Sequence, residues 1–268
     1  MGETVTLQLD GETRLFGIIG DPIAQTLSPQ SVTPLMVAMG ANAVLVPLHV
    51  PAGRLEEVMR GLMALRNFHG AMVTYPFKAE AMALLDTVRP TGKLVGAVNA
   101  IRREADGSWS GDIFDGRGLV AGMEKEGLSP RGLDILLLGG GGAGSAIALA
   151  LAEAGAARLT VFDVDGARAA ALADTVGQAF PDCATRSGPA DPAGCDLIVN
   201  ATPMGMQPGD PTPLDVALLK SGMTVFDIVP KPDVPLVTAA RAAGCRTIDY
   251  RAMAHGQYAA IARFFTGR

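Results

Sequence analysis

Leu133-Asp-Ile-Leu-Leu-Leu-Gly-Gly-Gly-Gly-Ala-Gly144 carries the clearest structural signal in this 268-residue chain. Its apolar run stops at four consecutive glycines, and an amphipathic segment of small residues, 145–154, follows. This pattern predicts a buried strand, a tight turn and a helix. Gly139, Gly141 and Gly144 stand at the G-x-G-x-x-G spacing, which lets the N–H groups of a helix N-terminus contact a pyrophosphate. The stretch therefore predicts a dinucleotide-binding turn.

A carboxylate follows the next apolar run and suits the same function. The run covers residues 159–162, and Asp163 comes directly after it, 19 residues beyond Gly144. In dinucleotide-binding folds, an acidic residue at about this distance accepts hydrogen bonds from the adenosine ribose. The alternative is an ordinary strand–helix turn with an exposed aspartate. The strand, the glycines, the helix and the acidic residue together favour dinucleotide binding.

Composition restricts the class of protein. Hydrophobic residues make up 49% of the chain and charged residues 18%, so a large core can form and disorder is not expected. The net charge is −5 without a basic run, which argues against nucleic acid as a main partner. No apolar stretch reaches the length of a membrane span, and the N-terminus lacks a signal-peptide pattern. The three cysteines and three histidines form no metal or redox motif, so we expect a cytoplasmic protein with reduced thiols and no metal.

Strands and helices alternate along both halves of the chain. In the first half this alternation predicts a mostly parallel α/β domain, with strands at 15–19, 43–48 and 71–74, a helix capped by Ser28, a helix after Lys78 and a hairpin near 97–109. In the second half, strands at 133–138, 159–162, 197–200 and 225–228 alternate with helices at 145–154, 166–180 and 214–220. This second pattern is typical of a doubly wound, Rossmann-type domain.

The expected fold is thus an α/β protein with two domains. Residues 1–114 and 250–268 are assigned to a substrate-binding and catalytic domain, because the final helix, 253–265, is placed back on the first half. Residues 115–249 are assigned to a Rossmann-type NAD(P)-binding domain.

Lys78 is the lysine best placed for chemistry. It follows Val-Thr-Tyr-Pro-Phe at the end of a predicted strand, where α/β sheets hold their ligands. A lysine that is partly removed from solvent has a lowered pKa and exchanges protons near neutral pH. The alternative is a solvated lysine at the start of a helix.

An aspartate at the domain boundary is the natural partner of this lysine. Asp115 ends the segment Gly111-Asp-Ile-Phe-Asp115, and its carboxylate can hold Lys78 and help to transfer a proton to or from a substrate hydroxyl. Asp112 is the competing aspartate, and capping of the next helix is a second role for Asp115. Asn99 suits either hydroxyl recognition or a turn, because its amide both donates and accepts.

Seven segments in order make the chain resemble the shikimate/quinate dehydrogenase family, and the resemblance covers nearly its whole length. Gly20-Asp-Pro-Ile-Ala-Gln-Thr-Leu-Ser-Pro29 is similar to the family's G-[ND]-P-I-x-H-S-x-S-P, and Val73-Thr-Tyr-Pro-Phe-Lys78 to the end of its N-V-T-x-P-[FY]-K. Gly96-Ala-Val-Asn99 matches G-A-V-N, and Gly111-Asp-Ile-Phe-Asp-Gly116 resembles G-D-N-T-D-G. The cofactor turn at 138–144, Asn200-Ala-Thr-Pro-Met-Gly-Met206 and the segment 249–257 resemble the remaining motifs.

The resemblance implies a reversible, nicotinamide-dependent oxidation of a ring hydroxyl beside a carboxylate, as in the conversion of shikimate to 3-dehydroshikimate. It implies that Lys78 and Asp115 are the catalytic pair, with Lys78 supplying the proton when the carbonyl is reduced. The residues it implies for the substrate carboxylate and ring hydroxyls are Thr26, Ser28, Thr74, Asn99 and Gln257. Those it implies for the cofactor are Gly139, Gly141, Gly142, Ala143, Gly144, Asp163, Thr202, Met204, Gly205, Met206 and Ile228.

Several positions depart from the family's motifs, mostly by loss of a polar group. Met72 stands where the family has Asn, Ile113-Phe114 replaces Asn-Thr, and Pro230 replaces a common Tyr; Gln25, Thr26 and Tyr250 differ as well. A site built to bond hydroxyls rejects analogues that lack them, whereas an apolar site does not. Two hypotheses follow. Either activity on shikimate is weak and a related cyclic hydroxy-acid such as quinate is the substrate, or shikimate is retained and the changes lie outside the contacts.

The expected cofactor depends on the residues after the second strand of the Rossmann-type domain. Many family members have Asn-Arg-Thr or Asn-Arg-Ser here, and the arginine holds a 2′-phosphate; this chain has Asp163-Val-Asp165. A carboxylate accepts hydrogen bonds from ribose hydroxyls and repels a 2′-phosphate. We therefore predict NAD in preference to NADP, with Arg168 and Arg186 as the side chains that could reverse this preference.

An alternative function of another class is a catalytically silent protein that binds NAD or a metabolite on the same fold. The retained Lys78 and Asp115 argue against it, because binding alone needs no proton-transfer pair. The expected partner is a small carboxylated ring molecule, rather than nucleic acid or a membrane, and the expected assembly is a monomer or a homodimer.

Overall fold

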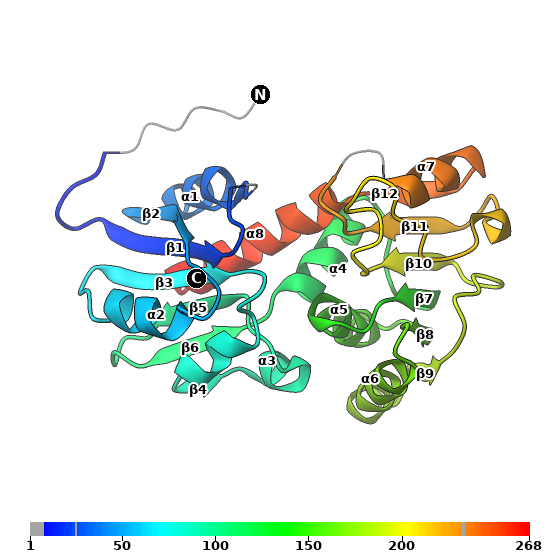
Figure 1. The fold of residues 1–268 in the computed structure, drawn as a ribbon, viewed down its shortest axis with the longest axis horizontal. Helices are drawn as coiled ribbons and strands as arrows, with labels where there is room; N and C mark the ends of the chain where they lie inside the picture. Colours follow the sequence, from blue (N-terminus) through cyan, green and yellow to red (C-terminus); the bar gives the residue numbers. More distant parts are fainter. Residues whose placement is uncertain (1–7, 25, 232–233) are drawn as a thin grey trace. The chain divides into compact units, whose positions relative to one another are not determined.

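The computed structural model describes residues 8–24, 26–231 and 234–268 (Figure 1). They form two compact units, one with the residues up to Phe114 and Tyr258–Arg268, the other with Asp115–Gln257. The C-terminal segment joins the first unit at Tyr258, whereas the predicted boundary lies at residue 250. Within the described ranges, no helix has the length and apolar character that crossing a membrane requires.

The first unit is built on a mixed sheet with the strand order β2-β1-β3-β5-β6-β4. The strands are β1 (Arg14–Gly20), β2 (Ala43–His49), β3 (Phe68–Val73), β4 (Thr87–Val88), β5 (Ala100–Arg103) and β6 (Trp109–Asp112). β1 is parallel to β2 and β3, whereas β5 is antiparallel to both β3 and β6. The ends of β1, β2, β3 and β6 and the start of β5 therefore share one edge of this sheet.

Two apolar clusters stabilise this sheet. Side chains of α1 (Ser28–Ala38) and of the last part of α8 (Tyr250–Thr266) lie in one cluster, and side chains of α2 (Leu55–Met63) lie in the other. Phe16 of β1 stacks on Phe265 of α8 with ring centroids 4.5 Å apart. Each large side chain buried in this way contributes roughly 1.5–3 kcal/mol. Two short elements, η1 (Glu80–Leu84) and α3 (Pro90–Val95), complete the unit.

The second unit has an all-parallel sheet with the order β12-β11-β10-β7-β8-β9. Its strands are β7 (Asp134–Leu138), β8 (Arg158–Phe162), β9 (Ala184–Ser187), β10 (Leu197–Asn200), β11 (Thr224–Asp227) and β12 (Arg246–Ile248). The order reverses between β7 and β10, where open α/β sheets bind ligands beyond the strand ends. The predicted α/β class and Rossmann-type sheet are confirmed.

The helices of the second unit pack closely through glycine. They are α4 (Asp115–Lys125), α5 (Gly142–Glu153), α6 (Gly166–Ala179), α7 (Pro235–Ala242) and the first part of α8. A Cβ atom on Gly116 would overlap the carbonyl oxygen of Ala146 in α5. On Gly122 it would lie 2.6 Å from the backbone of Ala252 in α8. Because side chains are missing at these positions, the backbone of α4 approaches both helices.

Several local predictions differ from the structure. Ser28 is the first residue of α1, and Leu27 occupies the cap position without a side-chain hydrogen bond. The segment after Lys78 and the segment 214–220 form only 3₁₀ helices, η1 and η2 (Val216–Leu218). β9, α7 and β12 were not predicted, because each is short and has no extended apolar periodicity.

Candidate active site

The shared edge of the first sheet brings together three segments that are distant in sequence. The backbone N–H of Asp21, after β1, donates to the carbonyl of Tyr75, after β3, over 3.0 Å. The N–H of Val73 donates to the carbonyl of Asn99, before β5, over 2.8 Å. A Cβ atom on Gly20 would overlap the methyl group of Thr74, so glycine is needed for this approach. Thr74 and Asn99, two predicted substrate residues, are thereby placed at one edge.

Thr26 and Ser28, the residues predicted to bind the substrate carboxylate, are joined by a hydrogen bond. The Thr26 hydroxyl donates to Ser28 Oγ over 3.1 Å, and the Ser28 N–H donates weakly to Thr26 Oγ1 over 3.4 Å. Ser28 is buried and Thr26 half-buried. Both hydroxyls lie where the chain leaves β1 and enters α1, so they belong to the same edge of the sheet.

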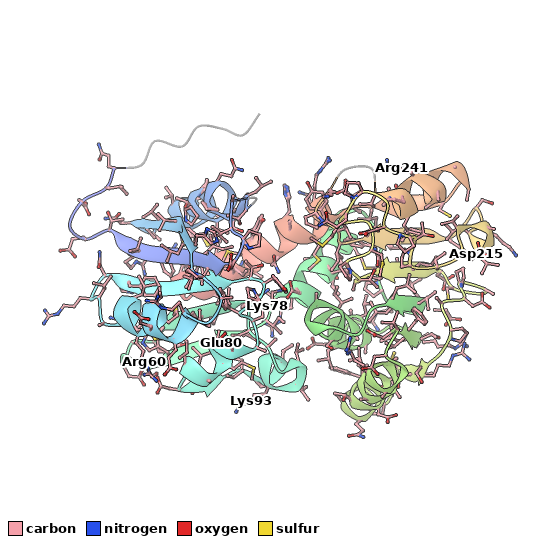
Figure 2. All side chains as sticks on the ribbon, viewed as in Figure 1. Arg60, Lys78, Glu80, Lys93, Asp215 and Arg241 are labelled. Atoms are coloured by element: carbon pink, nitrogen blue, oxygen red, sulfur yellow. The ribbon has the colours of Figure 1, made fainter. Side chains whose placement is uncertain are left out.

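Lys78 belongs to the turn that follows β3, and its side chain is half-buried (Figure 2). The carbonyl of Lys78 accepts the N–H of Val98 over 2.8 Å, which fixes this turn beside the residue that precedes Asn99. Asn99 is 3% exposed, and its Oδ1 accepts the N–H of Phe114 over 2.9 Å. The turn that carries Lys78 is therefore hydrogen-bonded to the segment before β5.

Three of the departures from the family's motifs are buried in the core. Met72, Ile113 and Phe114 are 5%, 1% and 4% exposed. The ring of Phe114 packs against Phe264 of α8, with centroids 5.2 Å apart. Met72 and Phe114 belong to the apolar cluster that includes side chains of α1 and α8, whereas Asn99, which is equally buried, is hydrogen-bonded to Phe114 N. Of the others, Pro230 is exposed, Tyr250 is half-buried, and Gln25 lies outside the described residues.

Asp115 and Gln257 are joined directly in the second unit. Gln257 Nε2 donates to Asp115 Oδ1 over 2.7 Å, and Asp115 is 4% exposed. This contact depends on glycine, because a Cβ atom on Gly118 would lie 2.7 Å from Gln257 Cβ and 2.9 Å from Gln257 N. The structure thus links a predicted catalytic residue to a predicted substrate-binding residue through the packing of α4 on α8.

Asp112, the competing aspartate, accepts backbone hydrogen bonds within the first unit. It is fully buried, and its Oδ1 accepts the N–H groups of Gly92 over 3.2 Å and Ile113 over 2.9 Å. A carboxylate used in this way connects the end of β6 to α3 within the first unit. Asp112 is thus hydrogen-bonded within the first unit, whereas Asp115 is hydrogen-bonded to Gln257 in the second.

The glycine turn after β7 has the geometry that its spacing suggests. Gly139 has a φ of 98°, a backbone conformation that side chains disfavour. A Cβ atom on Gly144 would overlap the carbonyl oxygen of Gly139, so the third glycine allows α5 to begin against the turn. Gly141 and Gly142 are exposed, Ala143 is half-buried, and nothing lies within 4 Å of a Cβ atom on Gly141. The N-terminus of α5 thus presents an uncovered backbone, as anion binding requires.

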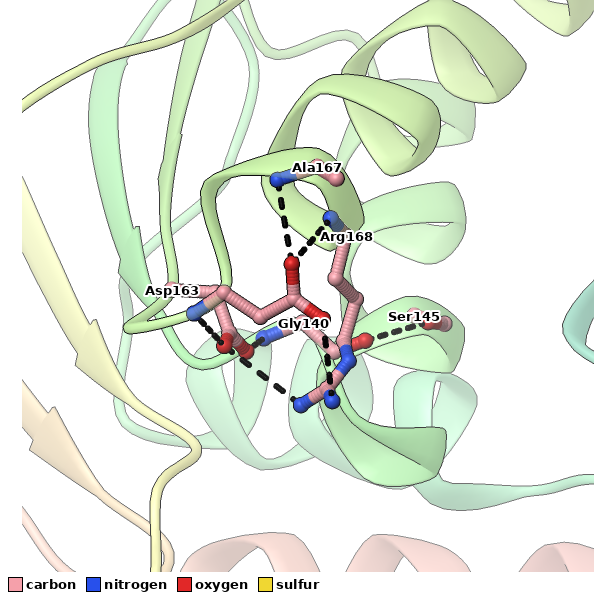
Figure 3. Close-up of polar contacts among 6 residues, drawn as sticks. Gly140, Ser145, Asp163, Ala167 and Arg168 are labelled. Atoms are coloured by element: carbon pink, nitrogen blue, oxygen red, sulfur yellow. Dashed lines mark hydrogen bonds and ion pairs between the residues drawn. The ribbon is translucent and has the colours of Figure 1, made fainter.

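Asp163 is turned toward this loop (Figure 3). Its side chain is 6% exposed, and it accepts the N–H of Gly140 over 2.7 Å and that of Asp165 over 2.9 Å. Burial opposes its ionisation, but these two N–H groups and the guanidinium of Arg168 outweigh burial and lower the pKa of Asp163. Arg168 Nη1 lies 3.4 Å from Asp163 Oδ1, and the Arg168 side chain is 52% exposed.

The loop after β10 lies beside the glycine turn. A Cβ atom on Gly139 would lie 3.0 Å from both Ala201 and the methyl group of Thr202. The loop continues through Met204 and Gly205, which has a φ of 98°, to Met206, and Ile228 N donates to Asn200 O over 3.2 Å from the end of β11. These predicted cofactor residues therefore border the point where the strand order reverses.

Two buried polar residues at this point were missed by the sequence analysis. Asn200 and Asp227 are 0% and 1% exposed, and Asn200 Nδ2 donates to Asp227 Oδ2 over 3.0 Å. Each is a polar residue that ends an otherwise largely apolar strand, Leu-Ile-Val-Asn200 and Thr-Val-Phe-Asp227. That repeated pattern was the available signal in the sequence.

Comparison with known proteins agrees with this geometry. Residues 18–101 match the family described as the shikimate dehydrogenase substrate binding domain. Shikimate dehydrogenase (NADP(+)) of Rubrobacter xylanophilus is 39% identical over 97% of this chain and 93% of its own length. The enzyme of the same name from Symbiobacterium thermophilum is 37% identical over 96% and 90%. A crystal structure of shikimate dehydrogenase in complex with NADP+ has a TM-score of 0.89 and 29% identity, covering 99% of this chain and 94% of that one.

The predicted preference for NAD is wrong. The two similar enzymes are named for NADP+, and the similar crystal structure contains NADP+. The prediction took Asp163 as a carboxylate that accepts hydrogen bonds from a ribose and repels a 2′-phosphate, whereas its oxygens accept the N–H groups of Gly140 and Asp165. Arg168 also places positive charge beside it, on the first turn of α6.

Sequence, fold and local geometry lead to the same assignment. The Rubrobacter enzyme is more than 30% identical over almost the whole chain, and the two sheets carry the motifs at their carboxyl edges. The chain therefore belongs to the shikimate/quinate dehydrogenase family of NAD(P)-dependent oxidoreductases.

Proposed function

We propose that this protein is an NADP-dependent shikimate dehydrogenase. It interconverts shikimate and NADP+ with 3-dehydroshikimate, NADPH and a proton. The observation that carries this proposal is the set of hydroxyl and amide side chains retained at the strand ends of the first sheet. Thr26, Ser28, Thr74 and Asn99 lie there, whereas the side chains of Met72 and Phe114 pack with those of α1 and α8 in one apolar cluster. The loss of polar residues in the motifs thus does not remove the hydroxyl-binding set, which favours shikimate over an altered substrate.

The predicted substrate and catalytic residues fall into three groups, and each group has its own proposed role. Thr26 and Ser28 bind the substrate carboxylate through their hydroxyls, and Thr74, Asn99 and Gln257 bind ring hydroxyls. Lys78 and Asp115 act on the hydroxyl that is oxidised, with Lys78 transferring the proton and stabilising the developing alkoxide. Gln257 holds the Asp115 carboxylate through its 2.7 Å hydrogen bond, so that one carboxylate oxygen keeps a constant orientation.

The cofactor supplies or accepts the hydride, and the residues present fit it. We propose that Gly141, Gly142 and Ala143 hold the pyrophosphate with their N–H groups at the start of α5. Gly139 and Gly144 shape this turn, and Thr202, Met204, Gly205, Met206 and Ile228 border the nicotinamide. Arg168 holds the 2′-phosphate, because its exposed guanidinium lies beside Asp163 and Asp165 and compensates part of their negative charge.

Steady-state kinetics of the purified protein test the proposal. We expect kcat/KM of about 10⁴ M⁻¹s⁻¹ or more for shikimate with NADP+, within the range of efficient enzymes. Quinate in place of shikimate, and NAD+ in place of NADP+, should each lower this value. A higher kcat/KM with quinate would establish the altered substrate instead. Tight NADPH binding without turnover of any ring hydroxy-acid would establish a binding protein.

A further inference from the structure

Asn200 and Asp227 form a buried polar pair at the carboxyl ends of two neighbouring strands. β10 and β11 are parallel, and the two residues are directly paired in their register. Burying a carboxylate and an amide is unfavourable unless hydrogen bonds replace those to water. Apolar residues of similar size would fill the position without this cost. The pair therefore calls for a reason beyond stability of the sheet.

The hydrogen bonds of the pair point to that reason. Asn200 Oδ1 accepts from Thr202 N over 3.0 Å and from Thr202 Oγ1 over 2.6 Å. Asn200 Nδ2 also donates to Met204 O over 3.4 Å, and Asp227 Oδ1 accepts from Val229 N over 2.9 Å. Among the described residues, each bond of the two side chains beyond their mutual one goes to a loop rather than to a strand. The pair thus orients the loops after β10 and after β11 together.

The loop after β10 is held further along its length. Thr202 Oγ1, which donates to Asn200, accepts the N–H of Met204 over 3.1 Å. Gly205 N donates to Asp210 Oδ2 over 3.1 Å, and Lys231 Nζ, from the loop after β11, donates to Met206 O. A change at Asn200 would therefore shift Thr202 and Met204 first, and the remainder of the loop through them.

We propose that Asn200 and Asp227 are positioning residues that hold the loops after β10 and β11 in the orientation that binds the nicotinamide half of the cofactor. This inference rests on the proposed function, because it takes Thr202–Met206 and Ile228 as the nicotinamide border. Among the described residues, the hydrogen bonds of the pair go to these loops and not to the glycine turn or Arg168, so we expect the pair to affect the nicotinamide half more strongly than the adenosine half. A displacement of about 1 Å in a reacting group can cost about 10²-fold in rate.

A reciprocal exchange of the two residues tests the pair. Asn200→Asp places two carboxylates against each other and removes the donor to Asp227. The double variant Asn200→Asp/Asp227→Asn restores a donor to that bond, with the new amide at position 227 donating to the new carboxylate at position 200. It also keeps acceptors for Thr202 and Val229 and loses only the weak bond to Met204 O. We expect Asn200→Asp to lower kcat about 10- to 100-fold and the double variant to recover most of that loss.

Binding measurements separate positioning from general damage. The dissociation constant of 2′,5′-ADP, which lacks the nicotinamide, should change less than about twofold in all variants, because its contacts lie outside the two loops. The fluorescence of bound NADPH, which reports on the nicotinamide surroundings, should change in Asn200→Asp and return in the double variant. Thr224→Val, at the opposite end of β11 and also buried, is the matched control and should leave kcat within about twofold, because Thr224 is distant from both loops.

The outcomes are distinguishable. Unchanged kcat and NADPH fluorescence in Asn200→Asp would overturn the positioning role, as would equal weakening of 2′,5′-ADP and NADPH. If the unmodified protein binds NADPH but does not turn over shikimate, the proposed function fails, and the fluorescence and fragment-binding results still decide the role of the pair. If Asn200→Asp does not fold, the single variant Asp227→Asn replaces it, since that change removes one of the two acceptors that hold Asn200 and Val229.

Discussion

The glycine turn after β7 and the polar edge of the first sheet are two halves of the proposed chemistry, and they are built differently. The turn comprises one continuous segment, 139–144, whose shape depends on missing side chains. The polar edge draws Ser28, Thr74 and Asn99 from three segments that meet through backbone hydrogen bonds between strand ends. A site within one continuous segment can be recognised from the spacing of its residues. A site that combines residues from several strand ends can be recognised only when the strand order is known. Four experiments test this difference, in decreasing order of expected effect.

The largest effect is expected at the polar edge. Lys78→Ala should lower kcat by about 10²–10⁴-fold, the usual contribution of a general acid or base. NADPH affinity should change little, because the substitution lies outside the unit that holds the glycine turn. Steady-state kinetics and NADPH titration measure both quantities. Lys93→Ala, an exposed lysine of α3 in the same unit (Figure 2), is the control, and a comparable loss there would contradict a specific role for Lys78.

A substitution that changes the shape of the glycine turn should weaken cofactor binding. Gly144→Ala introduces a Cβ atom against the Gly139 carbonyl, so the turn or the start of α5 must shift. We expect a loss of about 1–3 kcal/mol of unfolding free energy and a clear weakening of NADPH binding. Urea unfolding and NADPH titration provide the measurements. Gly166→Ala, where a Cβ atom meets nothing within 4 Å, should be close to neutral in both assays.

A substitution of Arg168 tests whether a residue beside the glycine turn, rather than Asp163, sets the preference between NADP+ and NAD+. Arg168→Gln should lower kcat/KM with NADP+ by about tenfold and leave the value with NAD+ nearly unchanged, since only NADP+ carries the 2′-phosphate. Arg158→Gln, another half-exposed arginine paired with an aspartate, should change neither value. An equal loss with both cofactors in Arg168→Gln would show that the arginine supports the turn rather than the phosphate.

The smallest effect is a pH dependence at Asp227. Burial raises the pKa of Asp227 above 3.8, although Asn200 and Val229 donate hydrogen bonds that lower it. A raised pKa in the folded state means that stability is lost as pH rises through that pKa. The melting temperature of Asp227→Asn, relative to the unmodified protein, should therefore increase as pH rises from about 4 to 7. Groups that share a pocket of about 90 Å³ with Asp227 include Lys231, Arg241, Asp249 and Arg251, and they remain in both proteins.

Thr224→Val provides the control for that measurement, because it changes β11 without altering a titratable group. Its difference in melting temperature from the unmodified protein should be independent of pH. A flat difference for Asp227→Asn as well would mean that the buried carboxylate titrates as it does in the unfolded chain.

Strands and turns were predicted well where an apolar run or a glycine pattern within one segment indicated them. The strands β7, β8, β10 and β11 and the glycine turn were all expected near their observed positions, because apolar runs that end in turns are local signals. The edge strands β9 and β12 were missed, since their sequences, Ala-Thr-Arg-Ser and Arg-Thr-Ile, contain no apolar run. The helical patterns of η1 and η2 gave only 3₁₀ turns, because neither segment extends far enough to form an α-helix.

From the residues alone we predict the α/β class, the Rossmann-type turn, the family and the polar residue types of the candidate site. These depend on spacing and side-chain chemistry along the chain. The direction in which each side chain faces emerged only from the folded structure. It turned Asp163 into its own loop, enclosed Met72 and Phe114 in the core, and paired Asn200 with Asp227 across two strands. The orientation of a carboxylate or an amide depends on hydrogen-bond donors and acceptors in segments that are distant in sequence. A local sequence pattern does not identify these partners.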